Sequence, residues 1–491
     1  MINTCNVIGS GFSGLSVAAH LSSSVKNINV FEKNNHFGGR ARQIVKDGFV
    51  FDMGPSWYWM PDVFERFFNK FGKQPSDYYD LVKLDPGFQI IFEHNHSMKI
   101  PQKWSEILNL FEKYEKGSSK NLVKFMEDAM YKYNVGMTSL VYQSGMSVFE
   151  LFRIDILKNI FKMNLFSSYR RHVYRYFKNP YLRSLLEFPV LFLGASPSDT
   201  PALYSLMGFS ALKQGTYYPI GGFGKVIDGM MSLCKELGVS FYNNHEIIKC
   251  NFDSNNIFSL VSNKGEHKCD YTVCSSDYQH FDQKILPSRF KHYSSKYWDE
   301  RLMSPSSLLF YIGVNKKIDK LEHHNLFFDE DIEQHTIDIY TDIKWPEKPL
   351  FYVCCPSKTD KSVAPSSYEN IFILMPIAAG INDNKSIREK YFEIIIQRIE
   401  KYAQTTIKDN ILFKDSYCVN DFKSDYNAFK GNAYGMANTL FQTANFKPKI
   451  KNKHLNNLFY TGQLTVPGPG VPPSIISGDV VANYIIENHK K

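Results

Sequence analysis

The beginning of the chain alternates between apolar and glycine-rich stretches in an order that predicts a βαβ unit. The apolar pair Val7–Ile8 leads into three glycines spaced as G-x-G-x-x-G: Gly9, Gly11 and Gly14. Apolar residues then recur at helical spacing, and a strand-like run, Ile28–Phe31, ends at Glu32. A strand, a tight turn, a helix and a second strand closed by an acid are the order required of a dinucleotide-binding unit.

Each glycine of this motif has its own physical reason. Gly9 permits the turn, Gly11 lets backbone N–H groups approach a pyrophosphate at the helix N-terminus, and Gly14 lets helix and strand pack closely. Glu32 can accept a hydrogen bond from a ribose hydroxyl. The alternative is a glycine-rich turn without a ligand. The predicted cofactor-binding residues of this stretch are Gly9, Ser10, Gly11, Phe12, Ser13, Gly14, Glu32 and Lys33.

Two glycines and two arginines follow soon after the acid, in the order Gly38-Gly39-Arg40-Ala41-Arg42. This arrangement suits a second phosphate contact, although the arginines could also be solvated surface charge. The extension resembles that of the FAD-binding amine-oxidase and carotenoid-desaturase superfamily rather than that of nicotinamide dehydrogenases. We therefore add Gly39, Arg40 and Arg42 to the expected cofactor site.

The next segment predicts a hairpin that returns to the nucleotide fold. Asp47-Gly48 forms its turn, and Gly54-Pro55-Ser56 ends its second strand. Three aromatic residues follow at once, and they form either a wall beside a flavin or ordinary core packing: Trp57, Tyr58 and Trp59. Residues 62–72 then predict a helix with its phenylalanines inward.

Residues 104–188 have helical periodicity and a basic character. Between Leu151 and Arg183 there are eight Lys or Arg residues against one acid, interleaved with Phe, Tyr, Leu and Ile. Such a pattern is typical of helices that lie in a membrane interface; a helical cap with a solvated positive side is the alternative. No helix-turn-helix, zinc-finger or sheet-aromatic signature accompanies the patch, so we expect no nucleic-acid partner.

The second half of the chain predicts a return to the nucleotide fold. A βαβ-like passage starts near residue 217, and its helix ends at Gly238. Residues 286–454 are mixed, with strands near 308–314, 350–355 and 371–376 and a helix over 386–402. Residues 457–478 predict a short strand, a Gly/Pro loop and a helix from Ser474, whose unpaired N–H groups would stabilise electron density on a flavin ring.

Composition adds three constraints. Net charge is +8 and aromatic residues make up 15% of the 491 residues. This pairing suits an anionic membrane face, or else a Phe-rich core in a Lys-rich chain. The eight cysteines form no CxxC, and no clustered His spacing suits zinc, so we expect a reducing compartment and no metal. No signal peptide or membrane-spanning run is visible, which predicts a cytoplasmic protein, peripherally bound to the cell membrane.

With these blocks in view, the chain resembles the bacterial-type phytoene desaturases, which are carotenoid-forming FAD enzymes of the carotenoid/retinoid oxidoreductase family. Besides the N-terminal motifs, the resemblance rests on Asp52–Ser56, Gly221–Gly224, Cys355–Asp360 with Ala364-Pro365, Asp421-Phe422 with Tyr426–Ala428, Gly431–Gly435 and Gly462–Gly470. The closing loop departs from the family pattern at Gln463, Leu464 and Val466.

The resemblance implies an α/β fold, in which a Rossmann-like FAD domain of the amine-oxidase/glutathione-reductase type holds an inserted, α+β, membrane-facing substrate domain. The implied FAD domain comprises residues 1–95, 215–285 and 455–491. The substrate domain comprises 96–214 and 286–454, with 104–188 helical. The resemblance adds these residues to the FAD site: Gly54, Pro55, Ser56, Gly462, Gln463, Gly470, Val471 and Pro472.

The implied function is the stepwise dehydrogenation of phytoene toward neurosporene or lycopene. FAD accepts a hydride, and quinone or oxygen reoxidises it. Glu150 and Arg153 match an acidic/Arg pair suspected of acid–base work in related desaturases; a surface ion pair is the plainer interpretation. A long polyene would have to come from a membrane with anionic lipids.

Several alternatives remain open at this stage. A thirty-carbon diapophytoene desaturase, a carotene isomerase and a saturase share the fold and FAD. A flavin amine oxidase is disfavoured by the middle blocks. A non-catalytic lipid-binding relative of the Rab-GDP-dissociation-inhibitor type is disfavoured by the intact Gly39-Arg40 pair and the C-terminal loop.

Overall fold

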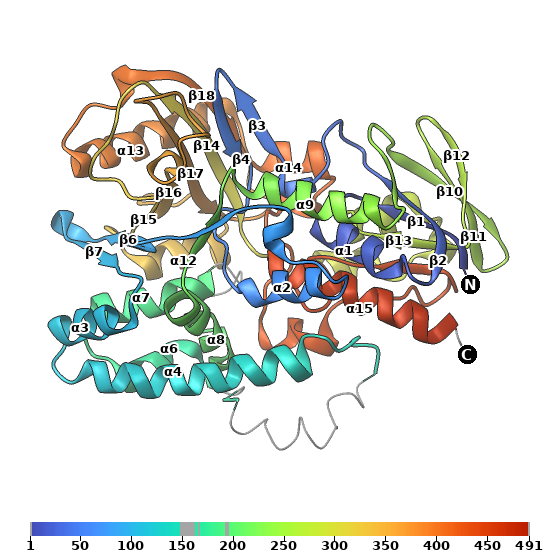
Figure 1. Ribbon diagram of the computed structural model, residues 1–491, viewed down its shortest axis with the longest axis horizontal. Helices are drawn as coiled ribbons and strands as arrows, with labels where there is room; N and C mark the ends of the chain where they lie inside the picture. Colours follow the sequence, from blue (N-terminus) through green and yellow to red (C-terminus); the bar gives the residue numbers. More distant parts are fainter. Residues whose placement is uncertain (1, 148–162, 165–166, 192–195, 490–491) are drawn as a thin grey trace.

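The computed structural model describes residues 2–147, 163–164, 167–191 and 196–489. Its organising element is a five-stranded, all-parallel sheet in the order β19-β13-β1-β2-β9. The strands are β1 (Ile2–Ile8), β2 (Val25–Phe31), β9 (Ser240–Tyr242), β13 (Tyr271–Cys274) and β19 (Leu458–Tyr460). Segments from both ends of the chain therefore belong to one sheet, with β13 between β1 and β19, and the two termini lie near each other in Figure 1.

Helix α1 (Phe12–Leu21) connects β1 to β2, and all ten of its residues are buried. It is enclosed because α15 (Val471–His489) and α9 (Phe223–Glu236) pack against it. The contact with α15 is close: the Ser16 hydroxyl donates to the Ile475 carbonyl at 2.6 Å. A helix buried all round needs apolar or small residues on every side, as its sequence provides.

A three-stranded antiparallel sheet covers part of the first sheet. It consists of β10 (Ile247–Asp253), β11 (Asn256–Ser262) and β12 (Gly265–Lys268). Ile8 and Phe31 of the parallel sheet share a core with Ile257 and Leu260 of this layer. The predicted strands over 240–242, 257–262 and 271–275 are confirmed in this region, within one residue at either end.

The second large sheet has seven strands in the order β18-β14-β17-β16-β15-β6-β7. They are β6 (Phe88–Ile91), β7 (Ser97–Ile100), β14 (Ser306–Val314), β15 (His324–Phe327), β16 (Phe351–Cys354), β17 (Glu369–Ile377) and β18 (Ile411–Tyr417). Helix α13 (Lys385–Ala403) shares the second core with this sheet. The predicted boundary at residue 95 falls between β6 and β7, which both belong here.

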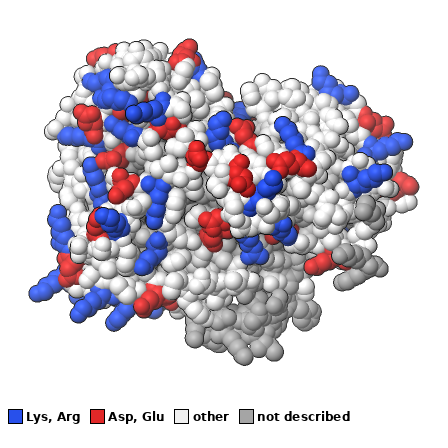
Figure 2. All heavy atoms as spheres, in the orientation of Figure 1, with Lys and Arg blue, Asp and Glu red and all other residues white. Residues whose placement is uncertain are grey.

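A helical region lies below this sheet in Figure 1. It contains α3 (Trp104–Tyr114), α4 (Ser118–Val135), α6 (Tyr169–Tyr176), α7 (Pro180–Leu191) and α8 (Leu206–Phe209). Other described α-helices, which lie outside this group, are α10 (Tyr278–His280), α11 (Ser295–Asp299), α12 (Ile332–Tyr340) and α14 (Val419–Tyr426). Lys and Arg gather on the visible face over α3 and α4, with acids among them (Figure 2). Within the described ranges, no helix is long and apolar enough to cross a membrane.

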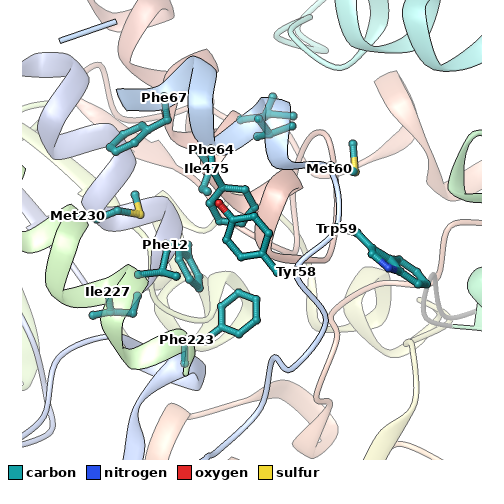
Figure 3. Close-up of a cluster of buried hydrophobic side chains, with 14 of the residues drawn as sticks. Phe12, Tyr58, Trp59, Met60, Phe64, Phe67, Phe223, Ile227, Met230 and Ile475 are labelled. Carbon is teal, nitrogen blue, oxygen red and sulfur yellow. The ribbon is translucent and has the colours of Figure 1, made fainter. Parts of the chain in front are cut away.

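Two short hairpin-like sheets connect these layers. The predicted hairpin is present as β3 (Gln43–Lys46) and β4 (Phe49–Asp52), and β5 (Leu81–Lys83) pairs with β8 (Tyr217–Pro219). Helix α2 (Pro61–Asn69) buries Phe64, Phe67 and Phe68 as predicted, but it ends before Phe71, which is half-buried in the following turn. Tyr58 stacks on Phe64 at 4.1 Å beside Phe223, so this tyrosine belongs to the core shown in Figure 3.

Candidate FAD and substrate site

A cleft runs from the carboxyl ends of the parallel strands to one face of the seven-stranded sheet. This is the edge at which ligands bind in open α/β sheets. Most of the predicted site residues lie on its wall: Gly9, Ser10, Gly11, Phe12, Ser13, Glu32, Lys33, Gly39, Arg40, Gly54, Pro55, Ser56, Gly462, Gln463, Gly470, Val471 and Pro472. Segments separated by more than four hundred residues thus meet at one site.

The first turn is built for a ligand at the N-terminus of α1. Gly9 has φ +100°, and its N–H donates to the Phe31 carbonyl at 2.8 Å, which joins the turn to β2. A Cβ on Gly14 would lie 2.1 Å from the Gly9 carbonyl oxygen, so Gly14 is a packing glycine and does not line the cleft. A Cβ on Gly11 would meet nothing within 4 Å, and no side chain caps the helix. The open, uncapped N-terminus fits a pyrophosphate.

Glu32 is buried at the end of β2 and faces the cleft. One carboxylate oxygen accepts from the backbone N–H of Ser10 at 3.1 Å and from the Ser10 hydroxyl at 2.6 Å. The other accepts from the backbone N–H of Asn34 at 3.0 Å. With a fourth bond from the Asn34 side-chain amide at 3.2 Å, these bonds fix the carboxylate and use its four lone-pair sites, so a ligand hydroxyl has to replace or share one of them. Binding of a ribose hydroxyl by Glu32 remains a prediction.

The two arginines of the Gly38–Arg42 stretch have different positions. Arg40 lines the cleft, its Nη2 donates to the Asn432 carbonyl at 3.3 Å, and its Nε has no hydrogen-bond partner among the described residues. Arg42 is absent from the cleft wall because Asp425 holds its guanidinium in an ion pair. A second phosphate contact is therefore open to Arg40 alone of this pair.

Gln463, where the closing loop departs from the family pattern, lies against Arg40. With its amide turned, its side-chain oxygen accepts from Arg40 Nη2 at 3.0 Å and from Nη1 at 3.3 Å. Asp277 is also buried on the cleft wall near Arg40, and burial raises the pKa of its carboxyl group. Sequence reasoning missed Asp277 because no motif marks it.

Helix α15 starts at Val471, three residues before the predicted start at Ser474. Two of its first three residues are prolines, Pro472 and Pro473, which carry no N–H. The backbone N–H of Ser474 already donates to the Gly470 carbonyl at 3.0 Å. Fewer free N–H donors are therefore present than expected. A negatively charged group at this terminus would be stabilised mainly by the helix dipole.

The other end of the cleft, which we call the apolar end, is formed by side chains without charge. They are Trp57 and Met207 together with Leu309, Leu374, Tyr352 and Tyr434, several of them from the seven-stranded sheet. The charged groups of the wall lie with the nucleotide motifs: Glu32, Lys33, Arg40, Glu246, Asp277 and Asp425. Of the predicted aromatic wall, Trp57 and Trp59 line the cleft and Tyr58 does not.

The basic, aromatic stretch at 151–183 is described only in part, and its membrane-facing role stays a prediction. Met163, Tyr169 and Phe177 are buried, and the exposed Tyr174 is covered by Arg183, whose Cζ lies 3.8 Å from the ring centroid. Tyr169 and Phe177 belong to the main core, whereas Tyr174 lies at the surface beneath the Arg183 guanidinium. Glu150, Arg153 and the rest of 148–162 lie outside the described residues.

The flavin containing amine oxidoreductase model matches residues 12–486 of this chain. The chain belongs to that family. Within it, a carotenoid 3,4-desaturase of Haloarcula japonica is 38% identical over 483 residues, covering 98% of both chains. A 4,4'-diapophytoene desaturase (4,4'-diaponeurosporene-forming) of Staphylococcus haemolyticus is 29% identical and also covers 98% of both. The predicted resemblance to carotenoid desaturases is confirmed.

Comparison with solved structures shows the same fold. An oxidoreductase from Methanosarcina mazei superposes with a TM-score of 0.62 at 14% identity, covering 99% of this chain and 100% of the other. The flavin of the family fits the site, because Gly11, the uncapped helix and Arg40 Nε leave room and donors for it. The protein is an FAD-dependent oxidoreductase, as predicted.

Proposed function

We propose that the protein is a carotenoid desaturase that introduces double bonds into phytoene, toward neurosporene or lycopene. The observation that carries this proposal is the uncharged apolar end of the cleft, which adjoins the flavin motifs. A bound hydrocarbon cannot solvate a charged side chain that it covers. An uncharged wall of Trp, Met, Leu and Tyr side chains therefore favours a hydrocarbon substrate.

FAD, when bound, supplies the hydride acceptor for the cleavage of a C–H bond. The protein's part is to hold and orient both molecules. The first turn and Arg40 would hold the phosphates, and Glu32 the ribose. Trp57 and Leu309 would keep water from the reacting carbons, because they close the apolar end with rings and methyl groups.

The substrate's poor solubility supports delivery from a membrane. At about 0.8 kcal/mol per CH₂, a forty-carbon chain costs roughly 30 kcal/mol to hold in water. Free diffusion through the cytosol is therefore excluded for such a molecule. We propose peripheral binding to a membrane with anionic lipids, and reoxidation of the flavin by quinone or oxygen.

A second candidate is desaturation at the 3,4 position of a carotenoid. It is favoured by the higher identity to the Haloarcula japonica enzyme, 38% against 29% for the thirty-carbon desaturase. Both candidates use the same cleft and cofactor, so the geometry of the cleft does not separate them.

The test uses the purified full-length chain, reconstituted with FAD, in anionic liposomes that contain phytoene and a quinone. We expect coloured products with longer conjugation in the absorption spectrum, identified by chromatography and mass. Parallel liposomes contain lycopene or 4,4'-diapophytoene. Phytoene left unchanged beside a converted lycopene would overturn the phytoene assignment in favour of 3,4-desaturation, and no conversion of any substrate by flavin-loaded protein would overturn the class.

A further inference from the structure

A short string of polar groups enters the apolar end of the cleft wall. The Ser56 hydroxyl and the Tyr352 hydroxyl, both on the wall, are 3.0 Å apart. The same Tyr352 oxygen lies 2.6 Å from Nδ1 of His324 on the adjacent strand β15. The Tyr352 hydroxyl can donate to the Ser56 oxygen or, when His324 Nδ1 carries no hydrogen, to His324. In the second arrangement its proton is directed at the imidazole.

His324 is held rigidly in this arrangement. It is completely buried, and the Trp57 ring stacks on it with centroids 4.1 Å apart and planes at 10°. His323 and Cys354 adjoin it, and burial lowers the pKa of His324 well below its ordinary value. The ring is therefore neutral at rest, with one nitrogen free to accept a proton.

Among the described residues, this string is the only link between a hydroxyl of the apolar end and an imidazole that could accept a proton. Its polar side chains are the hydroxyls of Ser56, Ser307, Tyr352 and Tyr434. Within the described residues, Tyr352 is the one hydroxyl of this set that is hydrogen-bonded to an imidazole. A proton released from a substrate carbon at this end can thus pass to His324 without crossing to the nucleotide end.

We propose that Tyr352 is a catalytic residue and His324 a positioning residue that together receive the proton lost in each desaturation. This proposal rests on the desaturase function proposed above. One C–H bond breaks as hydride to the flavin. A proton leaves the neighbouring carbon for Tyr352 Oη while the tyrosine's own proton moves to His324 Nδ1, and the carbon pair becomes a double bond.

The positive charge that would form on His324 would be matched by the single negative charge that bound FAD would gain with one hydride, that is, two electrons and one proton. That negative charge would offset part of the desolvation that disfavours an imidazolium at rest. The proton would return to solvent when the flavin is reoxidised, which restores the neutral ring for the next step.

The same residues could instead hold a metal, since one ligand atom each of His323, His324 and Cys354 lies within 4.8 Å of the others. We favour the proton path for two reasons. Nδ1 of His324 already has a partner in Tyr352, and the group contains no carboxylate. A divalent ion with a single thiolate would leave buried positive charge without compensation.

The test compares Tyr352→Phe, His324→Gln and the double variant with the wild type, all loaded with FAD. The readout is anaerobic reduction of the flavin by the carotenoid that the wild type converts. Each single variant should reduce flavin roughly 10²-fold more slowly, the lower range for acid–base groups. The double variant should be no slower than either single one, because the two groups act as a unit. The wild type should show a solvent deuterium effect that both singles lack.

His335→Gln is the matched control, since His335 is also buried and its Nδ1 accepts from the Leu350 N–H at 3.0 Å, away from the cleft wall. It should leave the flavin-reduction rate within a factor of three. Additive losses, an unchanged isotope effect, or Tyr352→Phe at near wild-type rate would overturn the relay, as would a stoichiometric metal in the purified protein that His324→Gln removes. Failure of the wild type itself to reduce its flavin would refute the proposed function instead.

Discussion

Gly11 and Gly14 belong to one motif, but we expect their replacement by alanine to have different effects, on FAD affinity in one case and on stability in the other. An added Cβ at Gly11 enters open space on the cleft wall, whereas at Gly14 it would meet the Gly9 carbonyl oxygen at 2.1 Å. We expect Gly11→Ala to retain its melting temperature and to lose about tenfold in FAD affinity, about 1.4 kcal/mol. We expect Gly14→Ala to lower the melting temperature of the FAD-free protein. Calorimetry and FAD titration measure both, and equal stability of the two variants would refute the distinction.

The buried environment of Lys447 leads to a prediction about how the stability of the protein depends on pH. Its Nζ is buried without a hydrogen-bond partner within the described ranges, and burial lowers its pKa to about 7. The unfolded chain keeps the ordinary value of 10.5, so between pH 7 and 10 the unfolded state binds more protons. The free energy of unfolding should then rise by about 1.4 kcal/mol per pH unit in that window.

Replacing Lys447 by Met removes this dependence. The variant should be more stable than the wild type at pH 7, and the difference should shrink toward pH 10. Urea midpoints at three pH values measure it. Lys449→Met is the control, because Lys449 Nζ has a partner in the Asn445 carbonyl at 3.0 Å. Parallel pH profiles for wild type and Lys447→Met would contradict the assignment of a neutral amine.

At the residue scale, prediction succeeded where the chemistry is local. The turn glycines and Glu32 are close in sequence, so their spacing alone fixes how they meet. Tyr352 and His324 could not be found that way. Their contact depends on the antiparallel pairing of β15 with β16. The sequence of neither segment identifies the strand with which it pairs. Arg42 illustrates the same limit, since its partner Asp425 is 383 residues away.

Among the elements, α1 and α15 form the closest helix contact and offer a test of how the cofactor site is held. A Cβ on Gly478 would lie 2.5 Å from the Ser16 Cβ. We expect Gly478→Val to destabilise the fold by about 1–3 kcal/mol through overpacking and to reduce FAD retention, since both helices start at the cleft. Gly238→Ala, at an exposed helix end with no neighbour within 4 Å, has φ +84° and controls for backbone strain alone. Equal FAD retention in the two variants would count against the role of the helix contact.

Elements with strong periodicity were predicted well, and their ends less well. The helix expected over 386–402 is α13, Lys385–Ala403. By contrast, α15 begins three residues early, because proline is well suited to the first helical turn and the Pro472-Pro473 pair starts the helix rather than delaying it. The apolar run from Phe188 was open to several interpretations, and its described part completes α7.

For the whole molecule, the described surface includes a pair of exposed phenylalanines suited to contact with lipid. Phe441 and Phe446 are 74% and 52% exposed, and their ring centroids are 6.3 Å apart. Their loop contacts the segment that leads to Met207 of the cleft wall, because the Thr443 hydroxyl lies 3.1 Å from that of Tyr204. We expect these rings, rather than the described part of 151–183, to enter the membrane interface.

The double variant Phe441→Ser/Phe446→Ser should bind anionic liposomes at least tenfold more weakly in a flotation assay, while its flavin spectrum stays unchanged. Phe258→Ser is the matched control, because Phe258 is 43% exposed on β11, in the small sheet that covers the nucleotide sheet. Equal flotation of the double variant and the wild type would show that lipid contact lies elsewhere.

The place of β19 at one edge of the parallel sheet has a consequence for biosynthesis. Ribosomes add about 5–20 residues per second, so the roughly 450 residues between β1 and β19 take about 20–90 s to appear. Throughout that interval the nascent chain lacks both the final strand and α15, and with them one wall of the flavin site. We therefore expect chains that terminate before β19 not to retain flavin.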